Sequence, residues 1–589
     1  MTLRALPAVA VLLSFQTVTC FAAQNLSSSV LQTRIPSAQS ADHLKDSEEA
    51  SKERIDSQNE VLGLVLSQVE TRASVPTISY TSDASGQTRV VHRTQQFFVR
   101  GRISRQIDIS LDPSSGAVYA KVESLFDTRG RVKTQKVYDA SGRRVLQMNF
   151  KYDTSGRVVS IQKKGSLPPA LLPNAGSIAP WFSQNQAATA TGLVVSHPDD
   201  TDFIYHEGHV ADWAKIYANT QGYTYNEALA GITMLNAGNL AGAKSVFDFY
   251  YSEFQKEKDN FSGFWTVYNV DPNFQWKRYE WRKGMGENAW FGLFCLWYES
   301  RATDPAEKQK ALELSTALAR WIATKVPHLE GAVAMGPLQP EAQVNFGTLY
   351  STENMLDYGA LLRELLKKSL SASDAALFSA ESTGIKDWLR TKAYDSSQGL
   401  FRRGGKLNAT SGLFEWDSIM SLDVDSWGIA AIGVSALKND FGIDVEALAR
   451  NTASRFALLD DNRFGANPLL SKGFDFADAT NAAAIGRSGL KWVEGTNQMI
   501  LAYRLLSNFY ASSNRTKSQY YAYLADTFSI RNTENQMTSP QGTSYVYADR
   551  ADTQIYDRTG NWKTFVGRSA ASSAWVYFSI RNINPFEIR

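Results

Sequence analysis

Six segments of one design recur along the C-terminal two thirds of this 589-residue chain. Each begins with polar or acidic residues and runs on into small and apolar residues. They start about 60 to 75 residues apart, at Thr224, Gly286, Ser351, Leu422, Val493 and Gly567. Between them lie amphipathic, more charged segments such as 306–326, 373–393 and 445–459. Charge-poor inner helices that alternate six times with charged outer helices predict an (α/α)6 toroid over residues 205–589.

The starts of four of these segments carry a resemblance to a known superfamily. They read Gly286-Glu287-Asn288-Ala289-Trp290, Ser351-Thr352-Glu353-Asn354, Asp423-Val424-Asp425-Ser426-Trp427-Gly428 and Glu494-Gly495-Thr496-Asn497-Gln498-Met499. With the repeat, they make residues 205–589 resemble the six-hairpin glycosidase superfamily. Its members are mostly glycoside hydrolases and polysaccharide lyases. The resemblance therefore implies carbohydrate chemistry and leaves the sugar and the reaction open.

Carboxylates gather at the starts of the expected inner helices. If these helices run parallel, their first turns meet at one rim and bring together Glu287, Glu353, Asp357, Asp423, Asp425 and Glu494. Glycoside hydrolysis needs one protonated and one ionised carboxyl group. We expect Glu353 to be the proton donor and Asp425 the base, with Glu287, Asp357 and Glu494 as further catalytic candidates. Asp423 has the character of a helix cap, and so does Glu227, which follows Thr224 at capping-box spacing.

Aromatic residues are abundant, with 14 Trp, 25 Tyr and 30 Phe. Flat rings stack on the apolar faces of sugars. Trp290 and Trp427 fall within the apolar helical pattern and are expected in the core. The aromatic residues near the expected rim or its loops are substrate-binding candidates, and they are Trp265, Tyr268, Trp276, Trp281, Trp416 and Trp492.

Possible metal ligands are dense just before the first inner helix. They are His197, Asp199, Asp200, Asp202, His206 and His209. Their spacing matches neither the His-Glu-x-x-His pattern of zinc proteases nor a closed structural zinc site, so no metal is expected. The sequence also has no phosphate-binding Walker loop, dinucleotide fingerprint or nucleophile elbow, and we expect no cofactor.

The first 23 residues have the layout of a secretory signal peptide. Arg4 precedes an apolar stretch from Ala5 to Phe15, and Ala22 and Ala23 offer a cleavage site. The stretch is shorter than the ~20 residues that a membrane-spanning helix needs. We expect export to the periplasm or the medium, with acylation at Cys20 as the alternative. Cleavage would leave Cys295 as the sole cysteine, so the mature chain would have no intrachain disulfide.

Residues 76–165 are expected to form a small antiparallel β module. Polar and β-branched residues alternate there and short glycine turns interrupt them. Three copies of one turn motif occur, Asp127-Thr128-Arg129-Gly130-Arg131-Val132, Asp139-Ala140-Ser141-Gly142-Arg143 and Asp153-Thr154-Ser155-Gly156-Arg157-Val158. They resemble the YD repeats of bacterial surface and toxin proteins, from which we take only the hairpin. A polar linker or helix is expected over 24–75 and a linker over 166–204.

Charge is divided unevenly between these regions. The whole chain has 61 Lys and Arg against 59 Asp and Glu, which argues against a general nucleic-acid binder. Residues 89–164, however, hold 16 basic residues against 6 acidic ones. This excess suits an anionic polymer or surface, although outward strand positions with solvated arginines would give the same composition.

Taken together, these features predict an exported glycoside hydrolase that acts on a polysaccharide or oligosaccharide through carboxylate acid/base chemistry. One alternative is a polysaccharide lyase that acts on an acidic glycan. Histidine is scarce after residue 210, so the catalytic base of such a lyase would be Tyr225, Tyr350 or Tyr358. Another alternative is an envelope protein that binds a glycan or a partner without catalysis.

Overall fold

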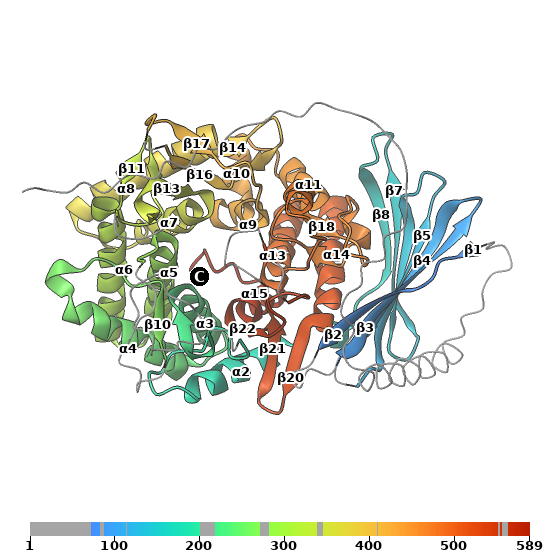
Figure 1. Ribbon diagram of the computed structural model, residues 1–589, viewed down its shortest axis with the longest axis horizontal. Helices are drawn as coiled ribbons and strands as arrows, with labels where there is room; N and C mark the ends of the chain where they lie inside the picture. Colours follow the sequence, from blue (N-terminus) through green and yellow to red (C-terminus); the bar gives the residue numbers. More distant parts are fainter. Residues whose placement is uncertain are drawn as a thin grey trace, which may run out of the picture. The chain divides into compact units, whose positions relative to one another are not determined.

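The computed structural model describes residues 72–82, 88–112, 115–200, 218–270, 282–338, 345–408, 410–551, 554–555 and 564–589 (Figure 1). The chain divides into two compact units, 1–63 and 64–589, and all described residues belong to the second. The expected signal peptide and almost all of the polar segment 24–75 lie outside the described residues. No helix in the described part of the chain is both long and apolar enough to span a bilayer.

The described chain begins with an antiparallel sheet, as expected for the β module. Its strands are β1 (Arg72–Ala73), β2 (Thr77–Ser82), β3 (Thr88–Val99), β4 (Arg102–Leu111), β5 (Val118–Phe126), β6 (Val132–Asp139), β7 (Arg144–Tyr152) and β8 (Val158–Gly165). From β3 onward each strand pairs with the next, and β1 and β2 both pair with β3. Consecutive hairpins therefore build the whole sheet.

The three repeated motifs form the turns after β5, β6 and β7. In each, the aspartate carboxylate accepts the backbone N–H of the arginine four residues later and pairs with its guanidinium. The intervening glycines have φ values of 75°, 77° and 82°, in the left-handed region that favours glycine. The hairpin interpretation is confirmed. Three of the module's arginines thus stabilise its turns.

Six inner helices form a closed ring. They are α3 (Thr224–Asn236), α5 (Met285–Arg301), α7 (Thr352–Leu365), α9 (Leu422–Trp427), α13 (Val493–Tyr510) and α15 (Ala570–Arg581). Each contacts the next in this order, and α15 contacts α3 (Figure 1). The toroid predicted from the repeat is confirmed. Cys295 is buried within α5, as its apolar neighbours suggested.

A second layer of helices surrounds the ring. The outer partners of the inner helices, in the order given above, are α4 (Leu240–Lys256), α6 (Pro305–Lys325), α8 (Ala372–Trp388), α11 (Val445–Phe456), α14 (Arg515–Asn532) and α2 (Ala175–Ala187). Shorter helices α10 (Val434–Asn439) and α12 (Ala479–Ala484) lie in the connections.

Helix α2 corrects the expected domain boundary. It lies within residues 166–204, which were expected to be a linker, and packs against α15 and α3. Its buried residues Ile178, Trp181 and Phe182 supply the apolar contacts. The first helix of the toroid therefore precedes residue 205 and completes the pair with α15.

Short strands precede or connect the inner helices. The pairs are β9 (Gln221–Tyr223) with β10 (Val267–Asn269), β11 (His328–Leu329) with β12 (Ala332–Val333), β14 (Tyr394–Asp395) with β15 (Leu400–Phe401), and β18 (Ala457–Leu458) with β19 (Gly473–Phe474). The triplets are β13 (Leu349–Ser351), β16 (Gly404–Leu407) and β17 (Phe414–Trp416), and β20 (Gln536–Ser539), β21 (Gly542–Val546) and β22 (Arg568–Ser569). Because β9, β13 and β22 end one residue before α3, α7 and α15, their pairing fixes where these inner helices begin.

The last residues, 582–589, pack into the ring and are called the C-terminal plug here. Phe586 is fully buried and its ring contacts three inner-helix tryptophans, Trp290, Trp427 and Trp575. Trp297 Nε1 donates to Pro585 O at 2.9 Å, and Arg363 donates to the backbone oxygen of Phe586. The terminus lies inside the ring in Figure 1. The plug therefore occupies the end of the ring opposite the helix starts.

A buried ion network joins the sheet to the toroid. It consists of His92 on β3, Asp108 on β4, Asp460, Arg531 and Glu534, and we call it the interface network. His92 Nδ1 lies 3.0 Å from Glu534 Oε1, and Arg531 pairs with both Asp460 and Glu534. Burial and Arg531 oppose a charge on His92, but Glu534 and Asp460 outweigh them and raise its pKa to about 10. Buried ion pairs thus hold the sheet to the toroid.

Candidate active site

Five carboxyl groups come together at the starts of the inner helices. They are Glu287 of α5, Glu353 and Asp357 of α7, Asp423 of α9 and Glu494 of α13, and we call them the acidic cluster. Charge repulsion from other members of the cluster raises the pKa values of Glu353, Asp357 and Glu494, which requires the groups to be close. Four of the five sequence-predicted catalytic residues are therefore brought together.

Glu353 is placed to hold a proton at neutral pH. It is the second residue of α7 and its side chain is half-buried. Burial is the largest cause that raises its pKa well above the usual range, followed by repulsion from Asp423, Glu494 and Glu287. The nearby Arg403 opposes this shift only partly.

Asp423 is the member of the cluster whose anion is best supported by donors. Its Oδ1 accepts the hydroxyl of Ser421 at 2.5 Å and the backbone N–H of Val424 at 2.8 Å. Burial is the largest influence and raises the pKa of Asp423 above its usual range, although these two bonds and Arg403 oppose the shift. Arg403 is itself held by Asp417, with its Nη2 3.2 Å from Asp417 Oδ2.

Glu494 is linked to a tyrosine across the ring. The hydroxyl of Tyr225, on α3, donates to Glu494 Oε1 at 2.6 Å and accepts the indole N–H of Trp575 at 2.8 Å. Burial raises the pKa of Glu494 to about 7, although the bond from Tyr225 opposes it. Burial and the adjacent Glu494 likewise raise the pKa of Tyr225, so this hydroxyl stays protonated.

Glu287 and Asp357 complete the cluster at different depths. Glu287 is half-buried and folds back over Gly284, where an added Cβ would lie 1.8 Å from its Oε2. Glycine at position 284 is therefore required for this rotamer. Asp357 lies one helical turn beyond Glu353 and is buried. Burial, Glu353 and Glu287 all raise its pKa.

Asp425 does not join the acidic cluster. Its carboxylate is fully buried and accepts the backbone N–H of Phe401 at 2.8 Å, near Thr452 of the outer helix α11. Two positions along an α-helix differ by about 200°, so Asp425 faces the outer layer when Asp423 faces the centre. This placement corrects the expectation that Asp425 is the base. Burial raises its pKa to about 8.

An aromatic group lies beside the acidic cluster. Trp290, Trp427 and Trp575 contact one another with ring centroids 5.6 to 6.0 Å apart, and Tyr225 lies 5.5 Å from Trp290. Trp290 and Trp427 are buried, as the apolar pattern predicted. These rings fill the centre of the ring of helices between the acidic cluster and the C-terminal plug.

The predicted sugar-stacking residues divide among several places. Tyr268 is buried against Phe249 and Tyr250, and Trp492 is buried with its ring stacked on Phe476 at 4.1 Å. Trp492 therefore packs in the core, whereas Tyr268 also lines a groove on the outer helices. Trp276 and Trp281 lie outside the described residues.

Trp265 and Trp416 are both half-buried and neither lies in the acidic cluster. Trp416, on β17, packs against Trp388 at the end of α8 and has the guanidinium of Arg402 4.8 Å above its ring. Trp265 lines the same groove on the outer helices as Tyr268.

The histidines before α3 have structural surroundings. His197 is half-buried among the rings of Tyr223, Tyr547 and Phe565, and desolvation lowers its pKa to about 4. Asp199 pairs with Arg568. Asp202, His206 and His209 lie outside the described residues, and nothing tests them as ligands.

Glu227 also differs from its expected role as a cap. Its carboxylate accepts the backbone N–H of Val194 at 3.0 Å, and Thr224 Oγ1 donates to Trp265 O. The capping box is therefore not formed. Among the described residues, His92, Asp108 and Asp460 could contact one metal ion, with ligand atoms within 4.8 Å. Arg531 and hydrogen bonds already occupy these carboxylates, which suits an ion network better than a metal.

A shared position at the helix starts identifies site residues that were not among the predicted catalytic residues. Tyr225, Glu353, Asp423 and Glu494 are each the second residue of their inner helix. Parallel helices with matched starts turn this position towards the same axis. An alignment of the six repeats on their helix starts would have selected Asp423 and Tyr225 in place of Asp425.

Comparisons with known proteins give likeness at the level of fold. No protein-family model and no curated protein matches the chain. Similar solved structures include an unsaturated glucuronyl hydrolase from Bacillus sp. GL1, with 10% identity and a TM-score of 0.46 over 70% of this chain and 98% of that one. Another is a cellobiose 2-epimerase from Bacillus thermoamylovorans, with 13% identity and a TM-score of 0.43 over 68% and 99%.

These similar structures are six-hairpin glycosidase-like proteins, and the likeness concerns the fold alone. An unsaturated glucuronyl hydrolase from Streptococcus agalactiae is also similar, with 10% identity and a TM-score of 0.45 over 71% of this chain and 94% of that one. At such identities and TM-scores the comparisons carry no argument about activity. The closed ring of inner helices itself establishes the toroid, and the chemistry of this chain must be inferred from its own residues.

Proposed function

We propose that this protein is a carbohydrate-active enzyme that hydrolyses glycosidic bonds, with Glu353 as the general acid and Asp423 as the base or nucleophile. The observation that carries the proposal is the contrast between these two groups. Burial raises the pKa of both groups, but three neighbouring carboxyl groups raise that of Glu353 further, whereas two hydrogen bonds and Arg403 lower that of Asp423. Two carboxyl groups whose surroundings separate their proton affinities are what acid/base hydrolysis requires.

The reaction assigns a step to each group. Glu353 gives its proton to the glycosidic oxygen as the bond to the anomeric carbon breaks. Asp423 takes a proton from a water molecule that adds to that carbon, or attacks the carbon itself before water releases the sugar. Either route consumes one water and leaves a new reducing end. The half-buried Tyr225 and its partner Glu494 supply a hydrogen-bonding pair for sugar hydroxyls beside the buried tryptophans.

The lyase alternative has weaker support because its base would have to be a tyrosine. Burial raises the pKa values of Tyr225, Tyr350 and Tyr358, so all three resist ionisation. Tyr358 also donates its hydroxyl to Ala319 O at 3.1 Å. A buried neutral tyrosine is poorly suited to remove a proton next to a carboxylate.

The test is an assay of the purified mature chain on neutral and acidic polysaccharides, read by reducing ends and by ultraviolet absorbance of unsaturated products. We expect Glu353→Gln and Asp423→Asn to lower the rate of reducing-end release by about 100-fold or more. Asp425→Asn is the matched control, since it makes the same change two residues from Asp423 but outside the cluster, and it should retain hydrolysis.

The other outcomes separate the alternatives. Absorbance together with reducing ends would indicate a lyase. Polymers that bind but stay intact would indicate a non-catalytic glycan-binding protein. Loss of activity in Asp425→Asn with full activity in Asp423→Asn would contradict the assignment of the base.

Export remains part of this proposal. Residues 1–23 have the layout of a signal peptide, and a polysaccharide substrate would be met outside the cytoplasm. The N-terminal sequence of the protein recovered from the periplasm or the medium tests this. A mature chain that begins near residue 23 or 24 supports it, and an uncleaved chain retained in the cytoplasm contradicts it.

A further inference from the structure

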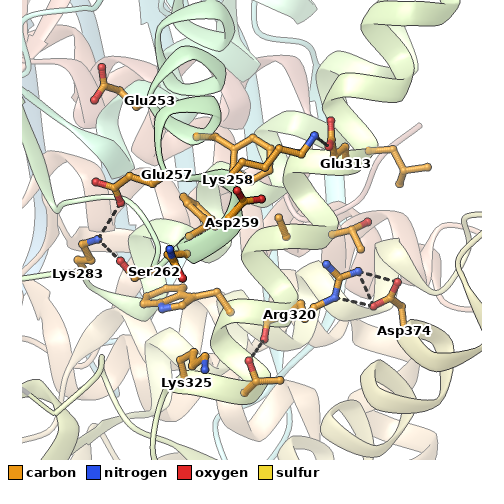
Figure 2. A pocket seen from close by; sticks show the side chains of 18 of the residues that line it. Glu253, Glu257, Lys258, Asp259, Ser262, Lys283, Glu313, Arg320, Lys325 and Asp374 are labelled. Carbon is orange, nitrogen blue, oxygen red and sulfur yellow. Dashed lines mark hydrogen bonds and ion pairs between the residues drawn. The ribbon is translucent and has the colours of Figure 1, made fainter.

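A large groove lies on the outer helices of the toroid, apart from the acidic cluster. It has a volume of about 1520 Å³ and is bordered by the end of α4, the length of α6 and the start of α8 (Figure 2). No member of the acidic cluster lines it. Its volume exceeds the ~300–1,000 Å³ of sites that enclose a drug-sized ligand, so it has room for several sugar units.

One aromatic residue gives the groove a sugar-stacking surface. Trp265 lines it and is half-buried. The buried Lys283 has its Nζ 4.5 Å from the centre of the indole ring, and the same Nζ lies 2.6 Å from Ser262 Oγ. Lys283 lines the groove as well, so the indole ring and the ammonium group above it are presented to the groove together. Aromatic faces of this kind pack against the C–H faces of sugars.

Pairs of opposite charges supply the rest of the polar lining. Arg320 binds both oxygens of Asp374 at 2.8 and 2.9 Å through one nitrogen, and Lys258 Nζ lies 2.6 Å from Glu313 Oε1 (Figure 2). The charged lining residues are Lys258, Lys283, Arg320 and Lys325 against Glu253, Glu257, Asp259, Glu313 and Asp374. The groove therefore has almost no net charge and is rich in both donors and acceptors.

We propose that this outer groove binds a stretch of neutral polysaccharide and holds the polymer against the enzyme. A neutral, hydroxyl-rich chain can donate to the carboxylates and accept from the cations, whereas a polyanion would meet five carboxylates. The groove is also connected to the ring, since Trp265 O accepts the hydroxyl of Thr224 at 2.6 Å, next to Tyr225. That the ligand is a carbohydrate rests on the proposed function. The location of the groove and the balance of its charges are independent of that function.

The test is affinity electrophoresis in gels that contain hydroxyethyl cellulose, dextran, soluble starch, heparin or polygalacturonate. The Glu353→Gln protein is used as the parent so that the polymer is not degraded. We expect at least one neutral polymer to slow its migration. Trp265→Ala should weaken that retardation by about fivefold, as the loss of one aromatic contact implies. Arg320→Ala, a change at a half-exposed side chain, should weaken it as well.

Trp416→Ala is the matched control, because it removes another half-buried tryptophan outside the groove and should leave retardation unchanged. Thermal unfolding of each variant shows whether it is folded. Retardation that persists in both groove variants, retardation by anionic polymers alone, or none by any polymer would overturn the proposal. None of those results would contradict hydrolysis by the acidic cluster. Retained hydrolysis in Glu353→Gln, in contrast, would overturn the proposed function without contradicting polysaccharide binding in the groove.

Discussion

Burial favours the protonated form of Glu353 and its charged neighbours add to this effect, which gives a prediction at the scale of single residues. Glu494 is one of the charges that raise the pKa of Glu353, and its own pKa is about 7. Above pH 7 Glu494 is therefore mostly ionised and repels a second negative charge. Glu494→Gln removes that repulsion, so the pKa of Glu353 should fall and the alkaline limb of the kcat/KM profile should move to lower pH.

The profile should be measured for the parent and the variant between pH 4 and 10. Gln498→Ala, which removes a neighbour of Glu494 without removing a charge, serves as the control. An alkaline limb that stays in place or moves to higher pH in Glu494→Gln would show that Glu353 does not control it.

The choice between Asp423 and Asp425 shows what the sequence can and cannot decide about a site. Both are acidic residues in the first turn of α9, so composition and spacing from the other repeats fit either one. Their roles differ because one position is the second of the helix and the other the fourth, which turns them to opposite sides. The helix must be known to begin at residue 422 before that distinction can be made, and helix starts are the least certain boundaries in a sequence.

The sheet is bound to the toroid by the interface network, and its stability should depend on pH in a defined direction. His92 has its pKa raised from 6.5 to about 10, so its contribution is complete below pH 6.5 and lost as the pH rises through 10. Glu534 has its pKa lowered to about 2 by Arg531 and His92 despite burial, so its contribution is lost only as the pH falls from 4.5 through 2. The contact should therefore be strongest between about pH 4.5 and 6.5.

His92→Gln tests this at the scale of the two elements. At pH 6 it leaves buried carboxylates without their partner and should lower the free energy of unfolding by about 3–5 kcal/mol. At pH 10 the difference from the parent should shrink, because the parent histidine is itself losing its proton. Urea denaturation at both pH values measures it. The control is His328→Gln, whose partner Glu381 lies nearer the surface, with an expected cost below about 1 kcal/mol. An equal cost of His92→Gln at both pH values would contradict the ionic role.

Elements with a regular pattern could be predicted, and irregular ones could not. The hairpins of the sheet and the inner helices follow from alternation, glycine turns and the repeat. Helix α2 was missed because Pro168, Pro169 and Pro173 precede it and Pro180 lies inside it. Prolines usually mark loops, but here α2 is stabilised by packing on α15 and α3, and contacts between distant segments leave no local signal.

At the scale of the whole molecule, the C-terminal plug connects the end of the chain to the centre of the site. Phe586 contacts all three central tryptophans and has no exposed surface. Phe586→Ala should therefore lower the free energy of unfolding by about 3–5 kcal/mol through the cavity that it leaves. It should also reduce hydrolysis, because the aromatic rings beside the acidic cluster lose their support.

Denaturation curves and reducing-end assays on Phe586→Ala measure the two effects. Leu413→Ala removes an exposed side chain outside the ring and should change stability by less than about 0.5 kcal/mol. Full stability in Phe586→Ala would show that the plug is dispensable for the fold. Full activity with reduced stability would separate the plug from the site.

The pairing of α2 with α15 has a consequence for how the molecule can form. Helix α2 ends at residue 187 and its partner begins at residue 570, so the seam of the ring joins segments from opposite ends of the toroid. Contacts of such long sequence separation form slowly, because a large loop must be closed before they contribute. Until α15 arrives, α2 and α3 each present an unsatisfied apolar face. A growing or proteolytically shortened chain is therefore an open arc that is prone to aggregate, and a chaperone that delays compaction would favour the closed ring.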